Sequence, residues 1–277
     1  MAGAGMNGIK ARIKSVKSTM QITGAMELVA TSKLRRAKEK VERTRPFTET
    51  LKEAIDVVIS EPELAGSIYS SPVSNKVLYV VIAGDRGLAG GYNANLFRMT
   101  ASNIKDGDLV LPIGKKSCEY YKSRTHTVWG EGVPEVADVG VGEALALGEA
   151  ITRGYLNGDY GRVVIVYTKF VSMMTQMALM EDVLPFSRSS SSGATPECDG
   201  DPEVILDAIV PRYLGGALYS ALCEAVASES GARRSAMNAA NKNAKEMIDG
   251  LMLKYNRARQ AVITQEITEI VSGAEAL

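Results

Sequence analysis

A glycine-rich turn is the stretch of this 277-residue chain whose residue types and spacing come nearest to a chemical site. The turn, Gly84–Asn93, follows Val77–Ile82, a continuous apolar run typical of a buried strand. A strand, a glycine-rich turn and a helix together seat a pyrophosphate in dinucleotide-binding folds. Here the spacing is Gly87-x-x-Gly90-Gly91, which is neither G-x-G-x-x-G nor a P-loop. The glycines therefore favour a tight, left-handed turn over nucleotide binding.

The other reactive side chains are too few and too scattered for a catalytic or metal centre. His126 is the only histidine, and Cys118, Cys198 and Cys223 include no C-x-x-C pair. Such cysteines predict neither a disulfide framework nor a zinc site, and they fit a reducing compartment. The serine-rich stretch 187–192 lacks the G-x-S-x-G elbow of serine hydrolases. The sequence thus predicts no catalytic residue, no cofactor and no metal.

The turn belongs to a region in which strands and helices alternate, which predicts a small, Rossmann-like α/β domain with a largely parallel sheet over residues 75–200. The expected strands are Val77–Ile82, Leu109–Ile113, Thr127–Trp129, Val163–Tyr167 and Thr175–Leu184, the last being a strand or its return. The expected helices are Ala94–Ser102, Lys115–Ser123 and Glu143–Leu156.

Long helices are predicted at both ends of the chain, over residues 1–60 and 203–277. Pro46 should bend the first or mark a junction in it. Asp201 is a suitable N-cap for the second, with Pro202 at its first position. No proline follows Pro211, so about 65 residues could form one helix about 95 Å long. A helix of that length indicates a coiled coil, a repeat or a shaft.

Heptad stripes on both terminal helices predict one antiparallel coiled coil made from the two ends of the chain. Thr23 and Glu27 interrupt the middle of the N-terminal stripe. The N-terminal stripe is Ile9, Ile13, Val16, Met20, Thr23, Glu27, Ala30, Leu34, Ala37 and Val41. The C-terminal stripe is Ala240, Ala244, Met247, Leu251, Tyr255, Ala258 and Val262.

Charge is unevenly distributed although the formal net charge is zero. Up to Arg45 the chain carries eleven Lys and Arg against three Glu. Such a block is either a solvated helix face or a surface for an acidic protein or a nucleic acid. Beyond Gln260 the chain becomes more apolar, and an exposed apolar tip needs an apolar socket. No apolar run approaches the ~20 residues of a membrane span, and no signal peptide is recognisable.

Four segments of the sequence carry a resemblance to a known family: IKSVKSTMQITGAMELVATSKLRRA from Ile13, DRGLAGGYNANLF from Asp85, ASESGARRSAMNAANKNA from Ala227 and YNRARQAVITQEITEIVSGAEAL from Tyr255. They closely resemble the γ subunit of F-type ATP synthases, bacterial type. The resemblance covers both helical ends and the first strand–helix unit, while the middle resembles the family in pattern more than in residues.

The resemblance implies a rotor shaft inside an α3β3 hexamer, with an α/β foot on the membrane c-ring beside the ε subunit. Such a chain performs no chemistry and couples ion flow to ATP synthesis or hydrolysis at the β subunits. It implies a peripheral location on the cytoplasmic face of the bacterial plasma membrane, with the membrane reached only through the Fo sector. No nucleic acid is expected.

The resemblance also implies which residues of this sequence are functional, because they occupy matching positions in the family's motifs. Met26 is expected near an acidic lever loop of a β subunit, Arg233 close to Met26, and Arg259 with Gln260 on polar β-subunit groups. The implied β-subunit contacts are Met26, Lys33, Arg36, Arg233, Arg259, Gln260, Thr264, Gln265 and Glu266. The implied foot turn near the c-ring and ε is Asp85, Arg86, Gly87, Gly90, Gly91 and Asn93. Gly24 stands where the family usually has a basic residue, and Arg234 stands where it usually has an apolar one. One positive charge is therefore absent at Gly24 and one is added at Arg234.

Two other classes remain as alternatives. An oxidoreductase-like nucleotide-binding domain with a helical dimerisation arm rests on the glycine turn alone. A basic coiled-coil nucleic-acid binder would show affinity that falls steeply with salt, but it leaves the apolar tip unexplained.

Overall fold

Two compact units make up the chain in a computed structural model that describes residues 2–61, 64, 66–124, 126–137, 139–187 and 200–275. The sheet unit is Thr31–Arg233, and the coiled-coil unit combines Met1–Ala30 with Arg234–Leu277. Helices α1 (Ala2–Val58) and α5 (Pro202–Glu275) contribute to both units. Most of the serine-rich stretch, and Cys198, lie outside the described residues.

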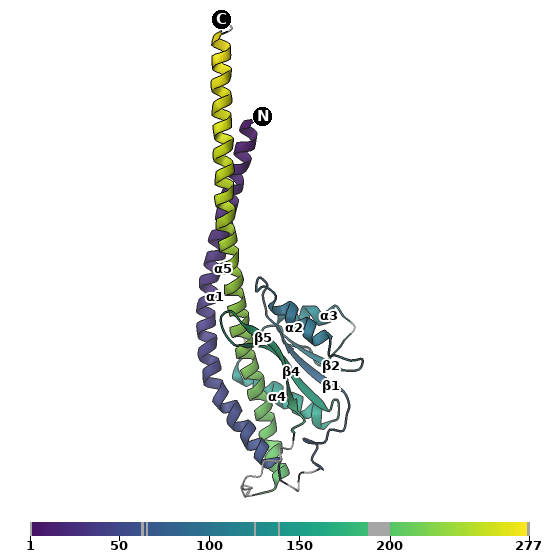
Figure 1. The fold of residues 1–277 in the computed structure, drawn as a ribbon. Helices are drawn as coiled ribbons and strands as arrows, with labels where there is room; N and C mark the ends of the chain where they lie inside the picture. The colour runs from purple at the N-terminus through teal and green to yellow at the C-terminus, as the bar shows by residue number, and fades with distance from the viewer. Residues whose placement is uncertain are drawn as a thin grey trace. The chain divides into compact units, whose positions relative to one another are not determined.

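In the coiled-coil unit, α1 and α5 run antiparallel, as the sequence predicts, and the end of α5 extends past the start of α1 (Figure 1). Every member of the predicted α1 stripe is buried or half-buried. The α5 stripe was predicted wrongly at Met247, which is 48% exposed whereas Ile248 is 9% exposed. Asn241 rather than the half-buried Ala240 continues the regular spacing. The stripe that α5 buries keeps the 4-3 alternation without a break: Met237, Asn241, Ala244, Ile248, Leu251, Tyr255, Ala258 and Val262.

The polar residues in the α1 stripe find polar partners on α5. Glu27 accepts hydrogen bonds from the side-chain amides of Asn238 and Asn241, each at 3.1 Å. The Thr23 hydroxyl donates to Asn241 Oδ1. The seam therefore tolerates both interruptions because their hydrogen-bonding groups are satisfied across the helix pair.

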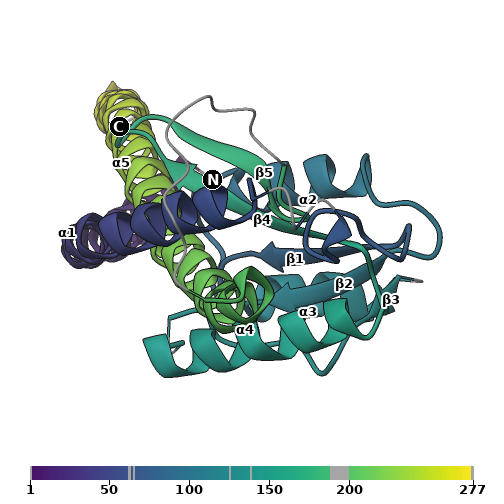
Figure 2. The same ribbon diagram turned by 90° about the horizontal axis from the view of Figure 1, so that it is seen from below.

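The sheet unit holds one five-stranded sheet in the order β3-β2-β1-β4-β5, which Figure 2 shows from below. All neighbouring strands are parallel except β4 and β5, which are antiparallel. This confirms the predicted α/β class with a largely parallel sheet. The strands are β1 (Val77–Ile82), β2 (Leu109–Ile113), β3 (Thr127–Val128), β4 (Arg162–Phe170) and β5 (Gln176–Leu184). The intervening helices are α2 (Tyr92–Ala101), α3 (Lys115–Lys122) and α4 (Val141–Leu156).

Strand β1 is apolar throughout because both faces of the sheet are covered. Leu78, Val80 and Ile82 pack into a core that includes residues of α1, α4 and α5. Tyr79 and Val81 pack on the opposite face with residues of α2 and α3. The carboxyl end of β1 therefore delivers the glycine turn between helices of both layers.

The long helices begin and continue as their sequences allow. Asp201 Oδ1 accepts the Glu203 backbone N–H at 3.0 Å, as expected of an N-cap. Helix α1 continues through Pro46, and α5 continues through Pro211. Within the described residues, no helix is both long and apolar enough to cross a membrane.

Candidate partner surfaces

The glycine turn is held by its own side chains in a geometry that needs unusual backbone angles. Gly90 has φ +59° and Leu88 has φ +61°, so both adopt the left-handed conformation. Asn93 Oδ1 accepts the Gly84 N–H at 3.0 Å. The Asp85 carboxylate accepts backbone N–H groups of Lys115 at 3.2 Å and Val136 at 3.0 Å. The Asn93 and Asp85 side chains therefore hold the turn in place and connect it to α3 and to the loop before α4.

Arg233 joins this turn to α5. Its guanidinium donates to the backbone carbonyls of Arg86 at 3.3 Å and Gly87 at 3.2 Å. It also pairs with Glu229 at 2.5 Å, and both side chains are nearly buried, with 12% and 11% exposed. The structure thus brings together Arg233 and two predicted turn residues. Glu229 was missed, although the Glu–Arg spacing of four on a helix is a recognisable signal for an ion pair.

Lys33 and Arg36 are exposed on the part of α1 that belongs to the sheet unit. Together with Lys40 they rim a groove of about 210 Å³. The groove's apolar lining comes from α1, α5 and the loop before α4: Ala37, Val136, Ala137, Val139, Tyr219, Leu222, Cys223 and Val226. A positive rim over an apolar floor suits an acidic, amphipathic partner segment.

Met26 lies half-buried in the coiled-coil unit and has exposed apolar neighbours on α1. Ile22, Leu28 and Val29 are 60%, 74% and 58% exposed. Large side chains that a two-helix coil leaves uncovered mark a surface available to a partner.

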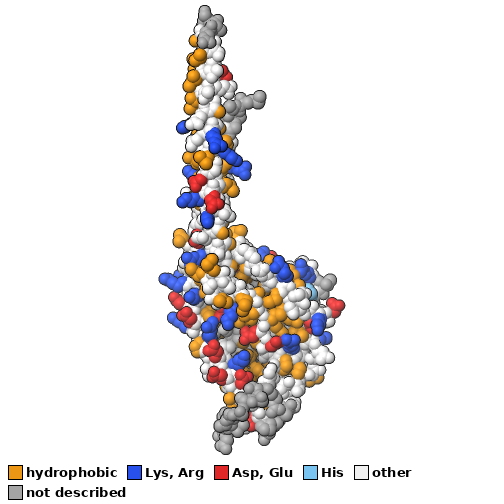
Figure 3. Space-filling model, viewed as in Figure 1, with side chains coloured by type: hydrophobic (Ala, Val, Ile, Leu, Met, Phe, Trp, Pro, Cys, Tyr) orange, Lys and Arg blue, Asp and Glu red, His pale blue; other side chains and the backbone are white. Residues whose placement is uncertain are grey.

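The end of α5 carries the remaining predicted contacts, all of them exposed: Arg259, Gln260, Thr264, Gln265 and Glu266. The hydrogen bonds described for these side chains lie within the helix, from Thr264 to the Gln260 carbonyl at 2.9 Å and from Gln265 to Glu269 at 2.9 Å. Ile263, Ile267 and Ile270 add an apolar face that is 46%, 56% and 71% exposed. Figure 3 shows hydrophobic side chains gathered along this end of α5.

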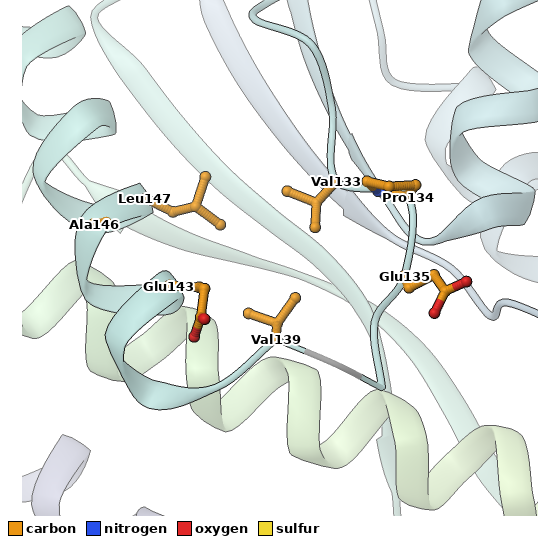
Figure 4. Close-up of a pocket in the computed structure, with 7 residues that line it drawn as sticks. All are labelled: Val133, Pro134, Glu135, Val139, Glu143, Ala146 and Leu147. Atoms are coloured by element: carbon orange, nitrogen blue, oxygen red, sulfur yellow. The ribbon is translucent and has the colours of Figure 1, made fainter.

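A hollow of about 610 Å³ lies between α4 and the loop that precedes it (Figure 4). Val133, Val139 and Leu147 contribute to its apolar lining. Glu143 stands at its edge, and its carboxylate accepts the Gly140 N–H at 3.1 Å to cap α4. Sequence patterns did not predict this hollow.

Metal ligands and thiols are the reactive side chains to consider in the described part of the chain. No cluster of three or more His, Cys, Asp or Glu side chains there could hold a metal ion. Burial raises the pKa of the Cys118 and Cys223 thiols, so they stay protonated near neutral pH. The sites that the geometry does offer are exposed surfaces on helices and a turn.

Comparison with known proteins decides the family. The profile of the ATP synthase family matches residues 5–277. The ATP synthase gamma chain of Ruminococcus albus is 42% identical over 281 residues, which cover 98% of each chain. This chain belongs to the ATP synthase γ chain family. The sodium-ion-specific γ chain of Acetobacterium woodii is 40% identical over 97% of each chain.

Solved structures agree with the fold of the γ chain family. The rotor of the Euglena gracilis mitochondrial ATP synthase matches with a TM-score of 0.66 at 18% identity, over 94% of this chain and 99% of that one. A chain from its F1/c-ring assembly matches with a TM-score of 0.69 at 18% identity, over 99% and 95%. Long terminal helices and a mostly parallel sheet are therefore shared at low sequence identity.

Proposed function

We propose that this chain is the central stalk of a bacterial F-type ATP synthase and that it couples rotation driven by an ion-translocating c-ring to nucleotide turnover in β subunits. The observation that carries the proposal is the match to γ chains along almost the whole length of both proteins. The exposed apolar and basic surfaces of α1 and α5 support it, because a rotor must present such surfaces to a surrounding sleeve.

The predicted partner contacts fit this role. Lys33 and Arg36 offer long-range attraction to acidic groups of a β subunit, which tolerates sliding better than interlocked apolar side chains do. Arg259, Gln260, Thr264, Gln265 and Glu266 would meet a β subunit at the α5 tip. The sheet unit would rest on the c-ring beside ε, and the subunit itself would have no catalytic site. As part of the complex it would lie peripherally on the cytoplasmic face of the membrane.

Rotation is the direct test. The chain would be assembled with matching α and β subunits and a bead attached at Ser123→Cys, an exposed position at the end of α3. Cys198 would be replaced by Ser, and Cys118 and Cys223 are buried. We expect ATP to drive unidirectional rotation in three main steps per turn. Assembly without rotation would contradict the rotor role, as would ATP hydrolysis by the isolated chain.

The α5 tip has its own test. Arg259→Ala combined with Gln260→Ala should leave the melting temperature unchanged, because both side chains are exposed. Coupled ATP synthesis by membranes containing the variant should fall severalfold. Lys254→Ala with Asn256→Ala is the matched control, since these residues are exposed on the preceding turn. Equal synthesis rates in the two variants would remove the tip contacts from the proposal.

A further inference from the structure

We infer that Arg233 and Glu229 form a joint that locks the glycine turn to α5 and so carries torque between this helix and the sheet. Both are positioning residues, and Arg233 acts inside the chain whether or not it also meets a partner. The transmission of torque rests on the proposed function, whereas the lock between the glycine turn and α5 does not depend on it.

The first support is the geometry of the pair. Besides bonding the carbonyls of Arg86 and Gly87, Arg233 fixes the carboxylate of Glu229, whose Oε1 also accepts the Arg86 N–H at 3.4 Å. One residue of α5 thus binds acceptors of the turn and the other binds a donor of it. Hydrogen bonds fix direction as well as distance, so the pair resists rotation of α5 against the turn.

Close packing is the second support. A Cβ atom on Gly84 would stand 2.7 Å from Cδ of Glu229, too near for any real contact. A methyl group on Gly84 would therefore displace the Glu229 side chain from the position in which it meets Arg233 and the turn. The glycine is accounted for by this contact without a bound phosphate.

Asp85 extends the connection beyond the turn. Its carboxylate accepts N–H groups from Val136 and from Lys115, the first residue of α3. One chain of hydrogen bonds therefore runs from α5 through the turn to α3 and to the loop before α4. Two neighbouring residues of the turn make these contacts: Arg86 is bonded to α5, and Asp85 is bonded to α3 and to the loop before α4.

Tyr92 adds a tether one helical turn before Glu229. Its hydroxyl donates to the Ala225 carbonyl at 3.2 Å. Burial raises the pKa of Tyr92 well above its usual value, so this hydroxyl remains a donor at any physiological pH. The joint lies at the end of the sheet unit, since Arg233 is the unit's last residue. Apolar packing nearer the start of α5 resists separation but is not directional.

The lock can be tested on the isolated chain by hydrogen exchange. Glu229→Gln should speed exchange of the Arg86 amide by about tenfold or more, because the acceptor of that amide loses its charge. Arg233→Ala should have a similar effect, because it releases the Glu229 carboxylate that accepts the amide. The double variant should add little to either single one, since the two residues act as a unit. Gly84→Ala should reproduce the effect without removing a charge. Unchanged exchange in the turn, or fully additive effects, would overturn the proposal.

Two controls separate the lock from general destabilisation. Arg257→Ala removes an exposed charge from α5 and should leave exchange in the turn unchanged. Arg233→Lys keeps the charge but not the planar fork, so it should restore the pairing with Glu229 only in part. If a variant fails to fold, Gly84→Ala and Arg233→Lys still decide the question.

The torque needs the assembled complex. In rotation assays with a bead on the sheet unit, Glu229→Gln, which alters no residue placed among the partner contacts, should lower the torsional stiffness by about twofold or more because a charged hydrogen bond is lost. Unchanged stiffness, with faster exchange in the turn, would overturn the torque but keep the lock. Absence of rotation in the unaltered chain would instead contradict the proposed function.

Discussion

Glu27 shows that a charged residue in a heptad stripe can be accommodated when the partner helix supplies hydrogen-bond donors. Its charge sits in an apolar stripe, yet two asparagines of α5 donate to its two carboxylate oxygens. Sequence reasoning found the stripe but not the partners, because the pairing register of two helices depends on side chains from both. The same error placed Met247 in the seam in place of Ile248.

We expect Glu27→Ala to lower the stability of the coiled-coil unit by about 1 kcal/mol, the usual scale for lost hydrogen bonds of this kind. Urea unfolding followed by circular dichroism would measure the change. Glu246→Ala is the control, since Glu246 is exposed on α5 in the same unit. Equal midpoints for the two variants would show that the asparagine contacts contribute nothing.

At the scale of elements, helical glycines differ in whether close packing between helices requires them. Helices α4 and α5 cross so closely that a Cβ on Gly148 would lie 2.4 Å from the backbone nitrogen of Gly215. A Cβ on Gly24 meets nothing nearer than the Asn241 side chain at 3.8 Å, and one on Gly250 meets nothing within 4 Å. We therefore expect opposite effects of alanine at these helical glycines: destabilisation at Gly148, and stabilisation at Gly24 and Gly250.

Gly148→Ala should destabilise the sheet unit by about 1–3 kcal/mol, because backbone must move to admit the methyl group. Gly24→Ala and Gly250→Ala should each stabilise by up to about 1 kcal/mol, since glycine is the poorer helix former. Thermal unfolding of the three variants checks the signs. A stabilising Gly148→Ala would show that the helices do not cross closely.

Most elements followed from the sequence because each has a local cause. The runs Val77–Ile82 and Leu109–Ile113 were predicted with their observed bounds, since buried parallel strands are apolar throughout. The strand near Val163 was predicted too short, because polar residues extend it at both ends: Arg162 pairs with Val77 of β1, and Lys169 pairs with Met177 of β5. The contacts of Arg233 with the glycine turn could not be predicted, because they join parts of the chain almost 150 residues apart.

At the scale of the whole molecule, tyrosines make the fold sensitive to alkali. Burial raises the pKa of Tyr155 to about 12, and burial also raises the pKa of Tyr160 and Tyr213. Below pH 10 these phenols are protonated in the folded and unfolded chain alike, so their contribution to stability is complete. Above pH 10 only the unfolded chain ionises readily, and stability is lost as the pH approaches 12.

We therefore expect the unfolding midpoint in urea to fall steadily between pH 10 and pH 12. Tyr155→Phe removes one of these phenols together with its hydrogen bond to the Ile68 carbonyl. The variant should start less stable at pH 8 but lose less stability than the unaltered chain over the alkaline range. Parallel curves for the two proteins would contradict a role for Tyr155 in this loss.

The uncovered end of α5 has a consequence for how the cell handles this chain. A lone helix segment in water is only marginally stable, and this one carries exposed isoleucines beside Arg257 and Arg259. In a copy without partners, proteases could therefore cleave this fraying end of the helix. Its exposed apolar side chains could also bind those of other copies. Surplus copies would be trimmed or would aggregate, whereas assembled ones would be protected. The surface that we propose for the partner subunits would in this way also keep the number of subunits in balance.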